Sequence, residues 1–438
     1  MITSTFKKDY FEIFFPILFS MISISLYNII DTFFISSINK EALAAFGLFS
    51  SVGFFTTILF AMTTKSIITF VSKTFGLGFQ KRLRDKIFVG QFVVLFFSLI
   101  FFLFFVFGNN LFNIAFDMED SIKNYFFQFY FIWVFIIFFE GSNSLLSGYL
   151  NSLKFAKYST FFLFICLLFN ISLDYILIFG NFGFPKLGIE GAAYATLISM
   201  ILQTIFLYIF LFKKGYLKTC FNLLKLKLYS KRMIKFSFPL IVQGFSLPFS
   251  IFVCTIIISN FETNFIASFG LVFKLEILPI VFTLASSATL GVLYPRYIHS
   301  KNFEDAKALL PFSILLSFLY TFLFFFCVIL FGDYFGSFFF EENDTIFIFH
   351  LCWIILTIPF LFTSFIGNIN SLFTSNFQAN ISLYIALFRT VLSFILLPFI
   401  AYYIFNDFWF ICGSIVLGHI LSFVFSFYLL KTKFKNIY

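Results

Sequence analysis

Long apolar runs alternate with short polar clusters along the whole chain. Each run can supply the roughly 20 apolar residues that a helix needs to cross a bilayer. We expect an all-α integral membrane protein with twelve transmembrane helices, whose ends hydropathy defines only to within a few residues. The predicted spans are 10–36, 43–76, 87–108, 121–150, 158–180, 187–212, 236–259, 263–294, 308–332, 345–373, 380–404 and 408–430.

The composition agrees with a chain that lies almost wholly in a membrane. Apolar residues make up 61% of the 438 positions and charged residues only 11%, whereas soluble domains are about 45 to 50% apolar and about a quarter charged. This excludes a soluble enzyme. The 84 phenylalanines occur in every span and on all helix faces, so they say little about a substrate.

The basic residues fall mainly on one side of the predicted membrane. Of the 29 lysines and arginines, 23 lie at the termini or in the even-numbered loops, and three lie in the odd-numbered loops. Because positively charged loops stay in the cytoplasm, we expect both termini to be cytoplasmic and the protein to reside in the inner or plasma membrane. The net charge of +9 reflects this asymmetry and attraction to anionic lipids. No nucleic-acid partner is needed to explain it.

The two halves of the chain resemble one another. A shift of 223 positions places Phe15-Pro16 on Phe238-Pro239. We therefore expect an N-lobe over 1–212, a cytoplasmic linker over 213–235 and a C-lobe over 236–438. Each lobe has six spans, an even number, so the repeats are parallel, as in secondary transporters that bind substrate where the repeats meet.

Two acidic residues lie deep inside predicted spans of the N-lobe. Asp31 in the first span and Asp174 in the fifth are each about 8 to 9 Å below the outer boundary, at about 1.5 Å per helical residue. An ionisable group in a span normally faces a cavity or a partner, and two carboxylates in a poorly solvated pocket cannot both stay ionised at low cost. We expect the pair to bind and release a proton near neutral pH. Polar side chains that would complete the site are Tyr27, Asn28, Asn170 and Thr196.

The C-lobe lacks this pair. The repeat places Cys254 opposite Asp31 and, at a shift of 219, Ser393 opposite Asp174. We therefore assign proton binding to the N-lobe alone. Candidates for the central cavity and for substrate contact in the C-lobe are Gln243, Lys274 and Glu276. For the glutamate, a buried structural salt bridge is the alternative.

Three further charged residues lie within spans. Lys65 and Glu140 occupy similar depths in the second and fourth spans, and we expect them to form a structural salt bridge rather than to bind substrate. Arg389, near the inner end of the eleventh span, is interpreted as a structural anchor on the cytoplasmic side.

Motifs for enzymatic chemistry and ATP binding are absent from the sequence. It contains no H-E-x-x-H, G-x-S-x-G or Walker-type pattern, its three histidines are far apart, and its six cysteines occur singly. We expect no enzyme activity, no disulfide, no metal or organic cofactor, and transport that is energised by an ion gradient.

Three stretches of the chain resemble the multidrug and toxic compound extrusion (MATE) family of twelve-helix antiporters. They are Leu26-Tyr-Asn-Ile-Ile-Asp31-Thr, then Asn170-Ile-Ser-Leu-Asp174-Tyr with the following Gly188-Ile-Glu-Gly-Ala-Ala-Tyr-Ala-Thr196, and Lys274-Leu-Glu276. The resemblance implies two six-helix lobes arranged in a V around a central cavity. It also implies a first helix that bends at Pro16 and a cation site formed by Asp31, Asn170, Asp174 and Thr196.

The seventh span departs from one branch of that family. Sodium-coupled members carry a glutamate there, whereas this chain has Gln243 and no acid between 239 and 259. This favours the DinF-like branch and coupling to H⁺, with Na⁺ bound at Asp31 and Asp174 as the alternative.

The expected function is that of a monomeric antiporter. It would export cationic or amphipathic small molecules, drugs and toxic compounds among them, in exchange for H⁺ by alternating access. A flippase for a lipid-linked oligosaccharide or lipid precursor is the alternative, although Lys65 and Lys274 are the only central cations available for a pyrophosphate. An intramembrane enzyme is the least favoured class.

Overall fold

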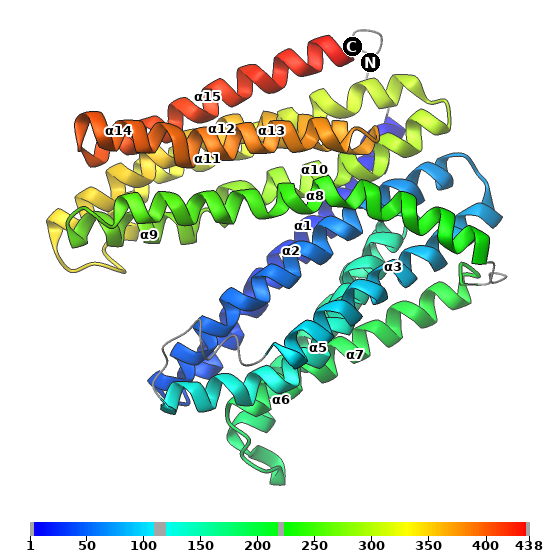
Figure 1. The fold of residues 1–438 in the computed structure, drawn as a ribbon, viewed down its shortest axis with the longest axis horizontal. Helices are drawn as coiled ribbons and strands as arrows, with labels where there is room; N and C mark the ends of the chain where they lie inside the picture. Colours follow the sequence, from blue (N-terminus) through cyan, green and yellow to red (C-terminus); the bar gives the residue numbers. More distant parts are fainter. Residues whose placement is uncertain (1–3, 109–119, 218–222, 435–438) are drawn as a thin grey trace. The chain divides into compact units, whose positions relative to one another are not determined.

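The computed structural model describes residues 4–108, 120–217 and 223–434, and within these ranges the chain is helical and contains no strand. Twelve helical stretches there are long and apolar enough to cross a membrane, which confirms the predicted all-α fold class. The elements, drawn in Figure 1, are α1 (Ser4–Ser36), α2 (Lys40–Gly76), α3 (Gln80–Phe107), α5 (Asp120–Ser152), α6 (Ala156–Phe179), η1 (Asn181–Gly183), α7 (Ile189–Lys213), α8 (Leu223–Ile258), α9 (Thr263–Leu275), α10 (Ile277–His299), α11 (Phe303–Gly336), α12 (Asn343–Ser375), α13 (Ala379–Val391), η2 (Leu392–Leu396), α14 (Leu397–Phe405) and α15 (Phe408–Lys433).

Several helix ends are set by residues that suit a cap. The Asn39 side chain accepts a hydrogen bond from the Ala42 amide at 2.7 Å at the start of α2, and Asp407 does the same for the Trp409 amide at 2.8 Å at the start of α15. Both satisfy amides that have no partner inside the helix. Gly180 ends α6 in the left-handed conformation, which glycine adopts without strain.

The helix α8 begins earlier than the predicted seventh span. It starts at Leu223, inside the segment expected to be a linker, of which residues 218–222 lie outside the described ranges. The first turns of α8 alternate leucine with lysine and arginine. Hydropathy identifies the residues that suit lipid, but a helix can continue beyond the membrane. The apolar run at 236–259 therefore predicted only the second part of α8.

Two spans are interrupted by proline. In the eighth span, Pro279 has no N–H for the carbonyl of Leu275, and the helix breaks there into α9 and α10. The hydroxyl of Tyr320 donates to the nearby carbonyl of Leu278 at 2.8 Å. In the eleventh span, Pro398 follows the π-helical turn η2, which separates α13 from α14.

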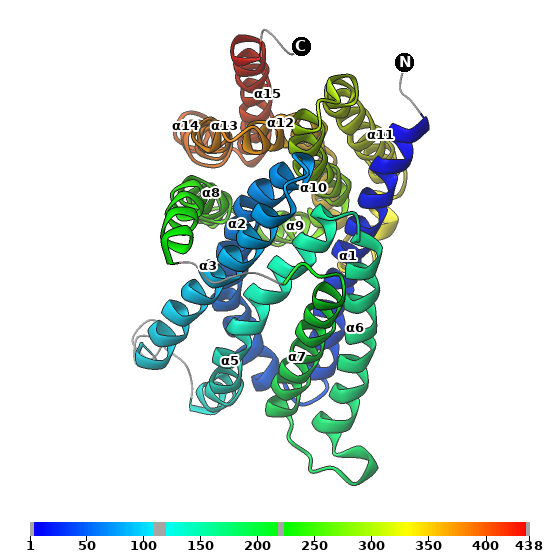
Figure 2. The same ribbon diagram turned by 90° about the vertical axis from the view of Figure 1, so that its right-hand side faces the viewer.

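The chain divides into two packed units. The N-terminal unit comprises Phe11–Ile241, and the C-terminal unit comprises the chain from Val242 onward together with the residues up to Tyr10. In the N-terminal unit, α5 packs against α2, α3, α6 and α7, and α6 also packs along α7 (Figure 2). These contacts place α6 and α7 side by side.

The C-terminal unit is built around α12. That helix packs against α9, α10, α11, α13 and α15, while η2 and α14 pack against α15 (Figure 1). The first turns of α1 belong to this unit, where the Tyr10 hydroxyl is hydrogen-bonded to the Ser286 hydroxyl at 3.0 Å. A buried cluster that includes Phe349 and Trp353 of α12 with Phe408 and Ile411 of α15 forms part of its core.

Glycine allows α6 and α7 to approach closely. A Cβ added at Gly191 of α7 would lie 2.7 Å from the backbone carbonyl of Leu177 in α6. We therefore expect Gly191→Ala to lower the free energy of unfolding by about 1 to 3 kcal/mol, because backbone cannot move aside as a flexible side chain can. Thermal unfolding of the purified protein in detergent measures the effect. Gly47→Ala on α2 is the matched control, since nothing lies within 4 Å of the added Cβ, and equal midpoints for the two variants would contradict the prediction.

Candidate cation-binding site

Asp31, Asn170 and Asp174 come together inside the N-terminal unit, although α1 and α6 are far apart in sequence. Their exposed fractions are 7%, 0% and 1%. The Asn170 amide nitrogen donates to Oδ1 of Asp31 at 3.2 Å and to Oδ2 of Asp174 at 3.0 Å, and the amide oxygen accepts from the backbone N–H of Thr196 at 3.2 Å. One amide therefore bridges the two carboxyl groups and ties them to α7.

Two hydroxyl groups extend this cluster. Tyr27 Oη and Thr196 Oγ1 are hydrogen-bonded at 2.9 Å, and Thr196 Oγ1 also lies 3.0 Å from the carbonyl oxygen of Ala192. The Asp31 carboxyl interacts with the Tyr27 hydroxyl and with the Asp174 carboxyl. Because the Asn170 amide nitrogen contacts both carboxyl groups, the two groups are close and repel each other when both are ionised. The arrangement therefore favours a shared proton or a bound cation.

One acceptor in the cluster remains available. Oδ1 of Asp174 is buried and has no hydrogen-bond partner among the described residues. A buried acceptor without a partner is costly, and a proton or a small hard cation would satisfy it. The groups on the cluster are oxygen ligands of the kind that hard cations prefer. The described part of the chain has no group of three or more His, Cys, Asp or Glu residues that could hold a metal ion.

The structure does not bring Asn28 into the cluster. Its side chain is exposed, and its carbonyl accepts a hydrogen bond from the hydroxyl of Thr32 at 2.7 Å. Asn28 lies three residues before Asp31, and Tyr27 lies four residues before it. On the surface of α1 these two side chains therefore lie on opposite sides of a line that runs through Asp31 parallel to the helix axis. Only Tyr27 faces α7, as its bond to Thr196 shows.

Pro16 lies within α1, which continues through it without a break. Proline leaves a helix one hydrogen bond short. At this point the hydroxyl of Thr160 in α6 donates to the carbonyl of Pro16 at 2.7 Å and is hydrogen-bonded to the Ser20 hydroxyl at 2.8 Å. The bend implied by the family resemblance remains a prediction.

The three C-lobe candidates do not form one site. Lys274 is exposed beside a surface hollow that includes Phe339 and Phe340. Gln243 Oε1 accepts from the Ser382 hydroxyl at 2.9 Å. Glu276 lies at the break between α9 and α10 and lines a small pocket.

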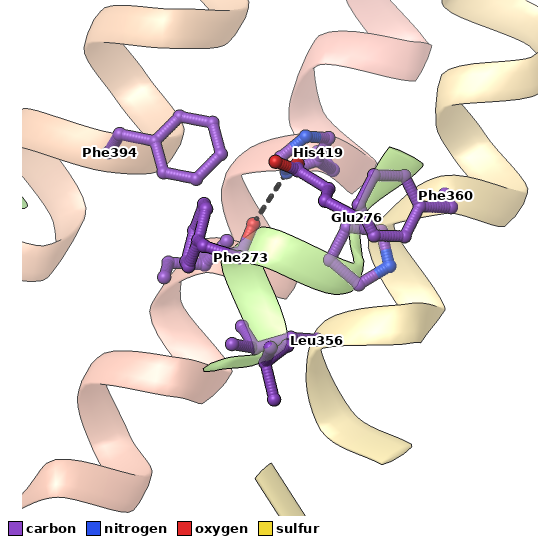
Figure 3. A pocket seen from close by; sticks show the side chains of 9 residues that line it. Phe273, Glu276, Leu356, Phe360, Phe394 and His419 are labelled. Carbon is purple, nitrogen blue, oxygen red and sulfur yellow. Dashed lines mark hydrogen bonds between the residues drawn. The ribbon is translucent and has the colours of Figure 1, made fainter. Parts of the chain in front are cut away.

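His419 of α15 lines the same cavity as Glu276 (Figure 3). Sequence reasoning missed this residue, because a single histidine in an apolar run is typical of a packing residue. A shift of 223 positions places Thr196 on His419, and this correspondence is the signal that could have identified it.

The expected salt bridge between Lys65 and Glu140 is wrong. The Glu140 carboxylate instead accepts hydrogen bonds from the hydroxyls of Thr56 at 3.2 Å and Thr57 at 2.5 Å. Lys65 lies eight residues further along α2 than Thr57, about 12 Å at about 1.5 Å per residue, too far for an ion pair.

Comparison with known proteins places the chain in a family. The MatE family profile matches residues 16–176 and again 239–399, and each boundary of the second match follows its counterpart by 223 positions. This confirms the internal repeat. The protein named "Probable multidrug resistance protein NorM" in Listeria monocytogenes serotype 4b is 27% identical over 312 residues, which are 68% of this chain and 67% of that protein. Its namesake in Bacillus licheniformis is 34% identical over 151 residues, 32% of each chain.

Solved structures share the fold. The crystal structure of MATE in the bent conformation matches with a TM-score of 0.89 and 20% identity over 99% of this chain and 96% of that one. An outward-facing multidrug resistance MATE family transporter of the MOP superfamily matches with a TM-score of 0.88 and 19% identity over the same shares. The chain belongs to the MatE family, the multidrug and toxic compound extrusion transporters, whose members are transporters and not enzymes.

Proposed function

We propose that this chain is a proton-coupled antiporter that exports cationic or amphipathic small molecules across the plasma membrane by alternating access. It acts as a monomer with both termini in the cytoplasm. The observation that carries the proposal is the bridge from the Asn170 amide to the carboxyl groups of Asp31 and Asp174. The multidrug resistance names of its relatives support the substrate class.

The bridged carboxyl pair supplies the link between proton and transport. When a proton occupies the pair, the repulsion between Asp31 and Asp174 is removed, and the contact between α1 and α6 is stabilised. When the proton leaves, two charges with one amide donor between them favour a different placement of α1. The protein can then adopt two arrangements, one with α1 in contact with α6 and one with α1 placed differently. Because these two arrangements have different affinities for the proton, proton binding shifts the population between them. A substrate that prefers the arrangement without the proton is then exchanged for it.

Reconstituted liposomes test this proposal. We expect an imposed pH gradient to drive transport of a cationic dye by the wild-type protein, and an uncoupler to collapse that transport. An imposed sodium gradient without a pH gradient is expected to drive none. Transport that follows sodium and ignores pH would replace H⁺ by Na⁺ as the coupling ion.

The same liposomes separate the antiporter from the flippase. A flippase would translocate a labelled lipid-linked precursor and leave the dye distribution unchanged. Liposomes without protein and liposomes with an inactive variant provide the two controls. Dye transport that is absent under every gradient, together with precursor translocation, would contradict the proposed function.

A further inference from the structure

A small pocket in the C-terminal unit brings two ionisable side chains together in apolar surroundings. Its volume is about 20 Å³, and Glu276 and His419 line it with apolar residues such as Phe273, Leu356 and Phe360 (Figure 3). A cavity of this size holds about one water molecule, provided that polar groups are there to bind it. The carboxylate and the imidazole are such groups.

The backbone around this cavity is irregular on two sides. Glu276 lies at the break between α9 and α10, and Phe394, which also lines the cavity, belongs to the π-helical turn η2. Non-helical backbone at membrane depth is tolerated where it lines a cavity inside the protein, and π-helical turns occur frequently at functional sites. Gly418 holds α15 against η2, since a Cβ added there would lie 2.5 Å from Cα of Ser393. The neighbouring His419 is therefore fixed against the π-helical turn.

The hydrogen bond of His419 defines which ring nitrogen is basic. Nδ1 lies 2.9 Å from the carbonyl oxygen of Ile415. A carbonyl can only accept, so Nδ1 carries the hydrogen and donates it. In the neutral ring, Nε2 is then the nitrogen with a lone pair that can take a proton.

Arg389 of α13 is the charged group that acts on both side chains. It is within electrostatic range of Glu276 and of His419, and it forms no ion pair within 4.0 Å with an acid among the described residues. A shift of 219 places Asn170 on Arg389 and Asp174 on Ser393. The C-terminal unit thus carries one ionisable group, Arg389, at the repeat position that corresponds to Asn170 in the carboxyl cluster of the N-terminal unit.

We propose that Glu276 and His419 form a second proton-binding site, inside the C-terminal unit, in which a water in the cavity relays one proton between the carboxyl oxygen and Nε2. The proton leaves the Glu276 hydroxyl for the water while a proton of the water passes to Nε2, so the pair with its proton is neutral overall. A second proton would neutralise the Glu276 carboxylate and leave the imidazolium beside the guanidinium of Arg389 without a compensating negative charge, which limits the pair to one proton. This site goes beyond the proposed function, because its existence does not require the carboxyl cluster of the N-terminal unit.

Loss of that proton changes the forces at the helix break. The Glu276 carboxylate then attracts Arg389 on α13, whereas the protonated carboxyl does not. Because Glu276 joins α9 to α10, this attraction acts directly on the junction of the two helices. The charge on the site therefore controls the conformation of the break.

Infrared difference spectroscopy between acidic and alkaline samples tests the site in the full-length protein in lipid nanodiscs. We expect a carbonyl band of a buried carboxylic acid in the wild type, its loss in Glu276→Gln, and a shifted titration midpoint of that band in His419→Gln. The band should persist in Asp31→Asn, which separates this site from the proposed function. Glu304→Gln, which removes an exposed carboxyl at the start of α11, is the matched control and should leave the band unchanged.

Two results would overturn the proposal. If Glu276→Gln retains every buried carboxylic acid band, the glutamate is not a proton site, and if His419→Gln leaves the midpoint unchanged, the proton is not shared. Should Glu276→Gln fail to fold, hydrogen exchange of wild type and His419→Gln decides the matter. After correction for the intrinsic rate, the wild-type amides of residues 273–278 and of residue 280 should exchange at a rate that depends on pH, and His419→Gln should move that dependence. Exchange that is independent of pH in the wild type would refute the proposal.

Discussion

Asp31→Asn should abolish transport driven by a pH gradient, with a loss on the order of a hundredfold, the upper range of typical coupling between two sites. Asparagine keeps the size of the side chain and can still hydrogen-bond to Asn170 and Tyr27, but it cannot take up a proton. The substrate would still bind, and no proton would shift the balance between the two arrangements of α1. Dye transport in liposomes under an imposed pH gradient measures the loss.

The control for Asp31→Asn removes a carboxylate elsewhere in the same unit. Asp120, in the first turn of α5, is exposed, and Asp120→Asn should transport at the wild-type rate. Thermal unfolding of both variants should show that each remains folded. Undiminished gradient-driven transport by a folded Asp31→Asn protein would remove Asp31 from the coupling mechanism.

Asn170→Leu should have the second largest effect, on both transport and stability. The substitution removes the donor that bridges Asp31 and Asp174 and the acceptor of the Thr196 amide. Each buried polar group left without a partner costs about 1 to 3 kcal/mol, and charged groups cost more. We expect a lower thermal midpoint together with loss of transport driven by a pH gradient.

A comparison with two other variants isolates the bridging role of Asn170. Asn170→Asp keeps the shape but replaces the donor by a third carboxyl group, so it should fail in transport as Asn170→Leu does. Asn28→Ala, on the exposed face of α1, should transport normally. Transport by Asn170→Asp at the wild-type rate would show that the bridge is dispensable.

The spans and the pairing of Asp31 with Asp174 could be predicted from sequence for physical reasons. Lipid demands long apolar helices, so hydropathy located all twelve spans. An acid in such a helix needs a buried partner, and equal depth identified which acids meet. Thr196 is expected as a hydroxyl group of the same lobe, and the family resemblance also implies it, but neither depth nor helical spacing links it to the two acids.

Other features could not be derived in this way. Helix breaks at Pro279 and around Pro398 depend on how neighbouring helices satisfy the freed carbonyls, which sequence does not report. Depth alone also misled for Lys65 and Glu140, because two residues at similar estimated depth can differ by two helical turns. The neighbourhood of Glu276 and His419 depends on tertiary packing of α9, α12 and α15.

The close contact of Gly191 with Leu177 determines which part of the carboxyl cluster can move. It joins α6 and α7 almost backbone to backbone, so Asn170, Asp174 and Thr196 keep fixed spacings, whereas Asp31 is carried by α1 alone. The size of the ion that fits is then set by the distance at which α1 holds Asp31. In the proposed mechanism, selectivity between a proton and a larger cation is therefore a property of the position of a single helix.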